Sequence, residues 1–418
     1  MRAAAGDGAW HWRRLLDGPH RLGFFLAMVV LAASGLWWAG VQLQRGGWLP
    51  LAPMAVAPSL VHAGVMTFGF FPLFFAGFLF TAGPRWLQVR GPSAAKLWPP
   101  LAAQCAGWLL WLGASHGHAR LAQIALLFPL LGFGWTTAAL WRLIRASRES
   151  DRLHPKIVGA AFAVGALSLA GLALALAFGG PAAARLAVLT GLWGCVVPVF
   201  VTVANRMIPF FAPPPADGLG RWPHGTLLWL LLAVCVFEVA AAWVDPLLGS
   251  QPLWHLARGA VELGTGAVLL WLAALWARVQ NIRIRLLSML YLGFAWFGVA
   301  LALAGGAQLA QSVTGVAALP LAPLHALTMG ALGSLMLAMV TRVTAGHGGF
   351  PVVADNFVWT LFWGLQAATL LRIAATLPGW PMQPLLTAAA LLWAGLMLAW
   401  GLRYGARYGR AAPPPRHR

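Results

Sequence analysis

The sequence predicts an all-α integral membrane protein, a polytopic bundle of about twelve transmembrane helices. Three observations lead to this prediction. Hydrophobic residues make up 60% of the 418 residues, charged residues make up only 9%, and long apolar runs recur along the chain with short polar breaks. Soluble globular domains carry about a quarter charged residues, and the hydrocarbon core of a bilayer requires about 20 apolar residues per helix. This composition excludes an ordinary water-soluble fold.

The apolar runs divide the chain into twelve predicted spans, separated by glycine–proline pairs, a triple proline and short polar loops. No linker is long enough to separate two soluble domains. We therefore expect one transmembrane domain over residues 1–418, with a short basic segment at 1–21 and a disordered tail at 404–418. The predicted spans are 22–42, 59–82, 97–113, 119–144, 157–178, 184–204, 225–244, 255–277, 285–305, 320–341, 356–377 and 383–403.

The distribution of Lys and Arg predicts the orientation of the chain. The net charge of +19 comes from residues in short loops between apolar spans, which form no continuous basic face for nucleic acid. The positive-inside rule and contact with the lipid bilayer explain them better. With a cytoplasmic N-terminus, 23 Lys and Arg fall on the cytoplasmic side and five on the other side. We therefore predict that both termini are cytoplasmic.

The second, sixth and tenth predicted spans share a pattern that indicates a repeat of three four-helix groups. Each span runs from outside to inside, has a Thr/Gly pair in its outer half and ends at an arginine. Thr and small residues are common in packed membrane helices, so chance is the alternative explanation. The pairs are Thr67/Gly69, Thr190/Gly191 and Thr328/Gly330, and the arginines are Arg85, Arg206 and Arg342.

Histidines near the outer ends of spans are the candidate ligands for haem or a metal ion. His62 and His325 each lie about one turn inside their spans, and neutral imidazole binds haem iron, copper and zinc. If the two spans occupy equivalent places, the two imidazoles face each other across the bundle. The alternative is that each is an interfacial histidine with ordinary hydrogen bonds. His347 is a reserve ligand, but the helix rise places it roughly 30 Å from His325.

The eighth span carries a polar stripe of His255, Arg258 and Glu262, whose spacing places all three on one helical face. An acid at that depth needs a partner, and Arg258 is the nearest candidate. The stripe is either a structural ion pair or a proton relay or cofactor contact. His255 is also a candidate metal ligand.

Arginines at the inner ends of the three related spans are candidates for holding an anion. Arg85, Arg206 and Arg342 could bind haem propionates through forked hydrogen bonds. The alternative is that they only anchor the helices on the cytoplasmic side.

The three cysteines all fall within apolar runs, so no disulfide framework is expected. The chain carries none of the common soluble catalytic motifs.

Three stretches resemble the NnrS family: Met66–Trp86, Asn205–Phe211 and, most closely, His325–Gly349. The resemblance implies a multi-pass protein of the bacterial inner membrane in the nitric-oxide response or denitrification. It further implies bound haem b, copper as a second metal, and nitric oxide or another small molecule as ligand. Twelve spans with outer histidines also resemble the catalytic subunit of haem–copper oxidases, although the paired-histidine copper motifs of that subunit are absent.

The chain departs from the family pattern at two places. Gly64 and Val65 stand where the family's second helix carries a His and a Glu, and Tyr291 stands where its ninth helix carries a His. These departures leave two alternatives open. One is a transporter whose polar core contains Arg258 and the intramembrane glutamates, and the other is a non-catalytic assembly factor without the metal site. Whether the protein is an enzyme stays open.

Overall fold

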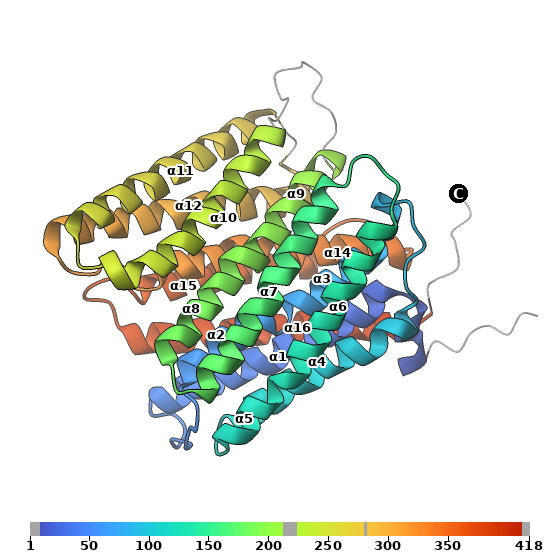
Figure 1. Cartoon of the computed structure of the whole chain (residues 1–418), viewed down its shortest axis with the longest axis horizontal. Coiled ribbons are helices and arrows are strands. Elements are labelled where there is room, and N and C mark those ends of the chain that lie inside the picture. Colours follow the sequence, from blue (N-terminus) through green and yellow to red (C-terminus); the bar gives the residue numbers. More distant parts are fainter. Residues whose placement is uncertain (1–8, 212–223, 280–281, 412–418) are drawn as a thin grey trace, which may run out of the picture.

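A computed structural model of the chain shows a bundle of long helices and, in the described residues 9–211, 224–279 and 282–411, no β-strand (Figure 1). A 3₁₀ helix, η1, precedes the bundle, and two π-helical segments, η2 and η3, interrupt it. The elements are η1 Trp12–Asp17, α1 Pro19–Arg45, α2 Pro58–Phe68, α3 Phe71–Trp86, α4 Ala94–Ala114, α5 Ala119–Ala125, α6 Leu127–Ala146, α7 Leu153–Ala177, α8 Pro181–Gly191, η2 Leu192–Val196, α9 Val197–Phe211, α10 His224–Leu248, α11 Pro252–Val279, α12 Arg285–Thr314, α13 Ala322–His325, η3 Ala326–Gly333, α14 Ser334–Gly348, α15 Asn356–Ala374 and α16 Met382–Tyr408.

The helices confirm the predicted polytopic bundle. Within the described residues, eleven helices or helix series are long and apolar enough to cross a membrane. The predicted span 97–113 corresponds to α4, which has 21 residues but is less apolar because it contains two prolines and a glutamine. The two chain ends lie side by side, since the backbone N–H of His11 donates to the carbonyl of Gly409 at 2.8 Å. Because both chain ends lie at the same end of the bundle, the chain must cross the bundle an even number of times. The eleven candidate spans and α4 together make twelve crossings.

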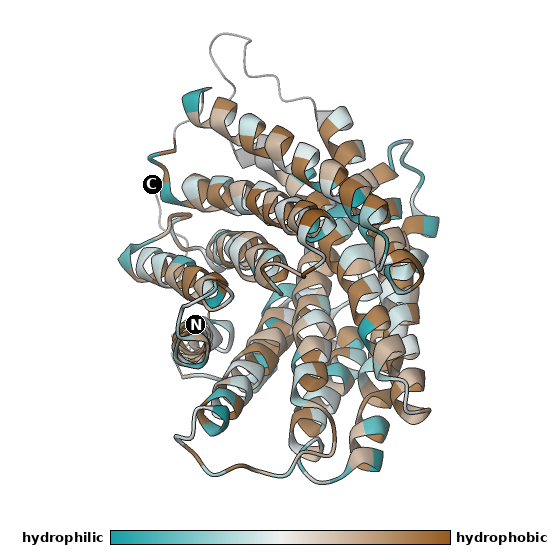
Figure 2. Ribbon diagram, turned by 90° about the vertical axis from the view of Figure 1, so that its left-hand side faces the viewer, coloured by the Kyte–Doolittle hydropathy of each residue, from teal (hydrophilic) through white to brown (hydrophobic). Residues whose placement is uncertain are grey.

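We call the end of the bundle that carries both chain ends the terminal end, and the other the far end. The last helix continues to Tyr408, and both Tyr404 and Tyr408 are buried. The disordered tail predicted from residue 404 therefore starts too early, because these aromatic side chains pack into the bundle. Residues 412–418 of that prediction, and 1–8 of the predicted N-terminal segment, lie outside the described residues. Figure 2 shows hydrophilic residues gathered towards helix ends and loops.

Three spans form the centre of the bundle, and they are the second, sixth and tenth, as the predicted repeat requires. In the most apolar stretch of each of these spans, most residues are buried: 89% in Pro58–Trp86, 72% in Pro181–Met207 and 78% in Ala322–Gly348. In the other eight candidate spans the buried share is 22–56%. The remaining helices surround these three and face the lipid. The central position explains why these spans carry small residues, since helices that are enclosed on all sides must approach their neighbours closely.

Each central span also has an irregular backbone at its Thr/Gly pair. The second span breaks between α2 and α3 at Gly69, the sixth contains η2 directly after Gly191, and the tenth contains η3 around Gly330. A Cβ atom added to any of these glycines would overlap a neighbouring atom. The π-helical segments η2 and η3 belong to a class of helix irregularity that often marks functional sites. The shared irregularity supports the three-group repeat beyond the composition of the sequence alone.

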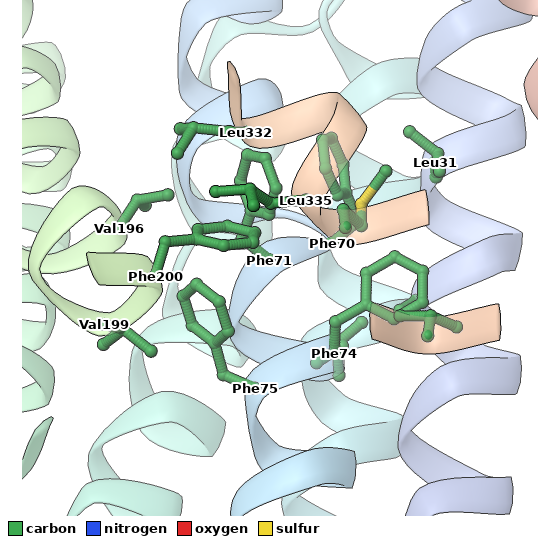
Figure 3. Close-up of a cluster of buried hydrophobic side chains, with 14 of the residues drawn as sticks. Leu31, Phe70, Phe71, Phe74, Phe75, Val196, Val199, Phe200, Leu332 and Leu335 are labelled. Atoms are coloured by element: carbon green, nitrogen blue, oxygen red, sulfur yellow. The ribbon is translucent and has the colours of Figure 1, made fainter. Parts of the chain in front are cut away.

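Aromatic side chains fill the space between the three central spans (Figure 3). Phe71 and Phe75 of α3 pack edge-on against Phe200 of α9, with ring centroids 5.3 and 5.2 Å apart. Next to them lies a small cavity of about 40 Å³ whose lining is entirely apolar. The centre of the bundle is therefore an apolar region, and polar groups gather at its two ends. The cavity is lined by Phe24, Phe74, Phe75, Phe78, Val199, Phe200, Val203, Met336, Met339, Val340 and Val343.

Candidate functional site

The structure places His62 near the start of α2 and His325 at the end of α13, so both lie at the far end of the bundle on different central spans. They interact electrostatically. His62 stands in the first turns of α2, and its ring stacks on Trp38 of α1 with centroids 4.1 Å apart and planes 17° apart. The Nδ1 atom of His62 is buried and has no hydrogen-bond partner. A buried imidazole nitrogen without a partner is a position where a ligand is expected.

The second imidazole of this pair is oriented by its own backbone. Nδ1 of His325 donates to the carbonyl of Leu321 at 2.9 Å, one helical turn earlier. A hydrogen bond from Nδ1 to a carbonyl fixes the tautomer that leaves the Nε2 lone pair available, as in many metal-binding histidines. The short α13 places this residue just before the π-helical η3. The irregular backbone of the tenth span thus begins at the candidate ligand.

Two arginines accompany the far-end pair. The guanidinium of Arg45 lies 5.4 Å from the ring centroid of Trp38, the same ring that stacks on His62. Arg45 and Arg372 both interact electrostatically with His62, and Arg372 also does so with His325. The far end therefore combines two imidazoles with two guanidiniums. Sequence reasoning missed Trp38 and treated both arginines only as charges on the outer side; the adjacent Trp37–Trp38 pair was the available signal.

A second histidine pair lies at the terminal end. The ring centroids of His20 and His347 are 4.8 Å apart, although one residue begins α1 and the other lies near the end of α14. Nδ1 of His20 is also buried without a partner. The sequence analysis did not single out His20, which lies in the basic segment before the first predicted span. The structure therefore gives His347 a partner other than His325.

The arginines predicted to bind an anion lie at this terminal end. Arg85 is close enough to His347 for their charges to interact, and the guanidinium of Arg206 lies 5.0 Å from the ring centroid of Trp86. Arg342 is half-buried on α14. They are separated from the far-end pair by the length of the central spans. Part of the Asn205–Phe211 motif, from residue 208 onwards, has side chains outside the described residues.

His255 does not join either pair. Its Nδ1 lies 2.5 Å from Oε1 of Gln308, and its Nε2 lies 2.8 Å from the carbonyl oxygen of Gly249. Because both ring nitrogens already have hydrogen-bond partners, the structure leaves no nitrogen of His255 open to a metal. Among the described residues, no group of three or more His, Cys, Asp or Glu is placed to hold a metal ion.

The predicted contact between Arg258 and Glu262 is present, with Nε and Oε1 2.7 Å apart. Arg258 also binds Glu238 at 3.1 Å and Asp245 at 2.5 Å. The sequence indicated one partner, whereas the structure shows three acids around one guanidinium. Asp245 was missed because it lies near the end of α10, where an isolated acid looks like an ordinary loop residue.

The family model described as NnrS protein matches residues 14–411, which is nearly the whole chain. No curated protein matches the chain.

Proposed function

Because the chain belongs to the NnrS family, which supports a role in the nitric-oxide response, we propose that it is a haem-binding protein of the bacterial inner membrane whose cofactor is held by His62 and His325. The observation that carries the proposal is the buried, unpartnered Nδ1 of His62 beside the oriented imidazole of His325. Neutral imidazoles are the usual axial ligands of b-type haem. Both termini would lie in the cytoplasm, and the site would open near the periplasmic side.

The residues at the far end fit such a cofactor. His325 has a fixed tautomer, and stacking on Trp38 holds the plane of the His62 ring. Arg45 and Arg372 offer positive charge to propionate groups, because guanidinium pairs well with carboxylate. Arg85, Arg206 and Arg342 lie at the other end of the bundle and do not serve the same cofactor. Bound haem would supply an iron centre, and one of the two imidazoles would have to leave it for nitric oxide to bind.

Copper fits the described residues less well than haem. Protein copper sites usually combine three or more nitrogen and sulfur ligands, and no group of three candidate ligands occurs within the described ranges. The three cysteines are free, buried and carried by helices of the bundle. A copper ion would therefore need a ligand from outside the two histidine pairs.

The transporter alternative receives less support from the structure. Its polar core was expected around Arg258, but α11 is the least buried of the measured spans, with 22% of its most apolar stretch covered. The centre of the bundle, where an alternating-access site would lie, is lined by apolar side chains. The assembly-factor alternative predicts no bound cofactor, so a spectrum distinguishes it directly.

The experiment is the optical spectrum of the purified protein and of histidine variants. We expect a Soret band with b-type bands that shift on addition of nitric oxide. His325→Ala should abolish or strongly shift the Soret band, and His62→Ala should weaken it. His347→Ala should leave it in place, because this residue lies at the terminal end.

His118→Ala is the matched control, since His118 is exposed in the loop before α5. If the His325→Ala protein keeps the haem content and spectrum of the wild type, the far-end assignment is wrong. If the wild type has no Soret band when haem is supplied during expression, the assembly-factor alternative is favoured. Complementation of a deletion strain under a nitric-oxide donor then tests whether His325 is needed for the cellular response.

A further inference from the structure

Three acidic side chains surround one guanidinium within the bundle, at a place that the proposed haem site does not use. Arg258 contacts Glu262, Glu238 and Asp245 at 2.7, 3.1 and 2.5 Å. The side chains of the two glutamates are only 5% and 0% exposed, whereas that of Asp245 is 41% exposed. Two fully ionised carboxylates and one guanidinium would leave an uncompensated negative charge in the buried part of the cluster.

Depth makes such a charge costly. Glu238 lies ten residues before the last residue of α10, and Glu262 lies ten residues after the first residue of α11; both of these helix ends are at the far end of the bundle. At 1.5 Å per residue, each glutamate is therefore roughly 15 Å from the far end. That is about half the thickness of the hydrocarbon core. Ionisable groups at this depth are expensive and need a partner. When two carboxyl groups share a site and only one positive charge is available, one of them keeps its proton.

The oxygen atoms of the two glutamates show where the proton belongs. Oε1 of Glu238 and Oε2 of Glu262 are both buried and have no donor. Both carboxyl groups contact the same guanidinium, Glu238 through Nη2 and Glu262 through Nε of Arg258, so they share one buried site. Two ionised carboxylates can only accept, so neither satisfies the other. A single proton on one of them supplies the donor that these buried oxygens lack.

We propose that Glu238 and Glu262 form a proton-binding site, in which one proton is shared between the two carboxyl groups at neutral pH. Glu262 lies nearer to the guanidinium of Arg258 and is the ionised member, so the proton resides on Glu238. The proton comes from water at the far end, and one carboxyl O–H donates to the other carboxylate. No other bond is made or broken.

The groups around this site define how the proton reaches it. From α10, Asp245 is the exposed acid at the far end, and from α11, His255 lies one turn before Arg258. From α12, the facing polar group is Gln308, which contacts His255. The exposed fraction of the acidic side chains thus decreases from Asp245, near the far end, to the two glutamates deeper in the bundle. This arrangement gives the protein a site that takes up a proton from one side of the membrane.

Infrared spectroscopy of the purified protein tests the proposal. We expect a carboxylic-acid C=O band at neutral pH that shifts in D₂O. The band should be lost in Glu238→Gln and in Glu262→Gln, and it should persist in Glu149→Gln, which makes the same chemical change at an exposed glutamate. Absence of the band in the wild type, or its survival in both buried variants, would overturn the proposal.

Folding is checked by size exclusion before the spectra are compared. Glu238→Gln mimics a neutral acid and should keep the wild-type profile and melting temperature at neutral pH. If Glu262→Gln does not fold, the spectrum of Glu238→Gln alone decides the result. A melting temperature that falls as much in Glu238→Gln as in Glu238→Ala would also contradict a protonated Glu238. None of these readouts depends on haem, so they test this site independently of the proposed function.

Discussion

The closest approach between α1 and α3 provides a sharp test of how the bundle is packed. Gly23 of α1 faces Gly77 of α3, and a Cβ atom at position 23 would lie 2.6 Å from both the Cα and the N atom of Gly77. Carbon atoms prefer a separation of about 3.5–4.0 Å. The obstacle is backbone, so no side-chain rotation can relieve it. Gly23→Ala must therefore push the two helices apart by roughly 1 Å.

The expected cost follows from this displacement. Overpacking of a well-packed core costs about 1–3 kcal/mol, and this contact adjoins Phe24, which is 1% exposed and lines the central cavity. Replacing a helical glycine with alanine otherwise gains up to about 1 kcal/mol from helix propensity. The clash outweighs that gain, and we expect a net loss of stability in Gly23→Ala.

Gly40→Ala is the control, because Gly40 lies on the same helix and nothing stands within 4 Å of its added Cβ. Unfolding of both variants would be followed in one detergent, by heat or by a denaturant titration. Gly40→Ala should be as stable as the wild type or slightly more stable. If Gly23→Ala proves equally stable, α1 and α3 do not pack in the way described here.

Three further predictions concern charge. Arg258→Ala should destabilise the protein by about 3–5 kcal/mol, as for other buried ion pairs that lose one partner. The loss should exceed that in Glu262→Ala, because Arg258→Ala leaves three acids without their cation, whereas Glu262→Ala leaves Arg258 in contact with Glu238 and Asp245. In a double-mutant cycle the two changes should be non-additive, and strict additivity would show that they do not interact. Partial burial alone would raise the pKa of Asp355, but hydrogen bonds from a backbone N–H and from Arg403 outweigh it and hold that pKa below its usual range. The stability that Asp355 contributes should therefore be present at neutral pH and be lost in acid, as the carboxylate is protonated. Asp355→Asn should flatten this part of a stability–pH curve. Reporter fusions after Ser150 should report the cytoplasm and those after Ser250 the periplasm, and a periplasmic signal at Ser150 would refute the orientation.

The sequence by itself determined the number and the approximate positions of the membrane spans. This was possible because a bilayer requires apolar runs of a fixed length, and such a run is a local property of the chain. The three central spans also shared a visible Thr/Gly pair at Gly69, Gly191 and Gly330, but the irregular backbone beside each pair is a property of the structure. The prediction that His62 and His325 face each other depends on that repeat.

Tertiary structure alone decided which residues complete each cluster. Trp38 stacks on His62, His20 meets His347, and Asp245 reaches Arg258, and local composition does not show which of these side chains meet. They depend on how each helix is rotated and which neighbours it packs against. A span has the same length and hydropathy whichever of its faces turns inward, so only the packed bundle determines which polar side chains come together.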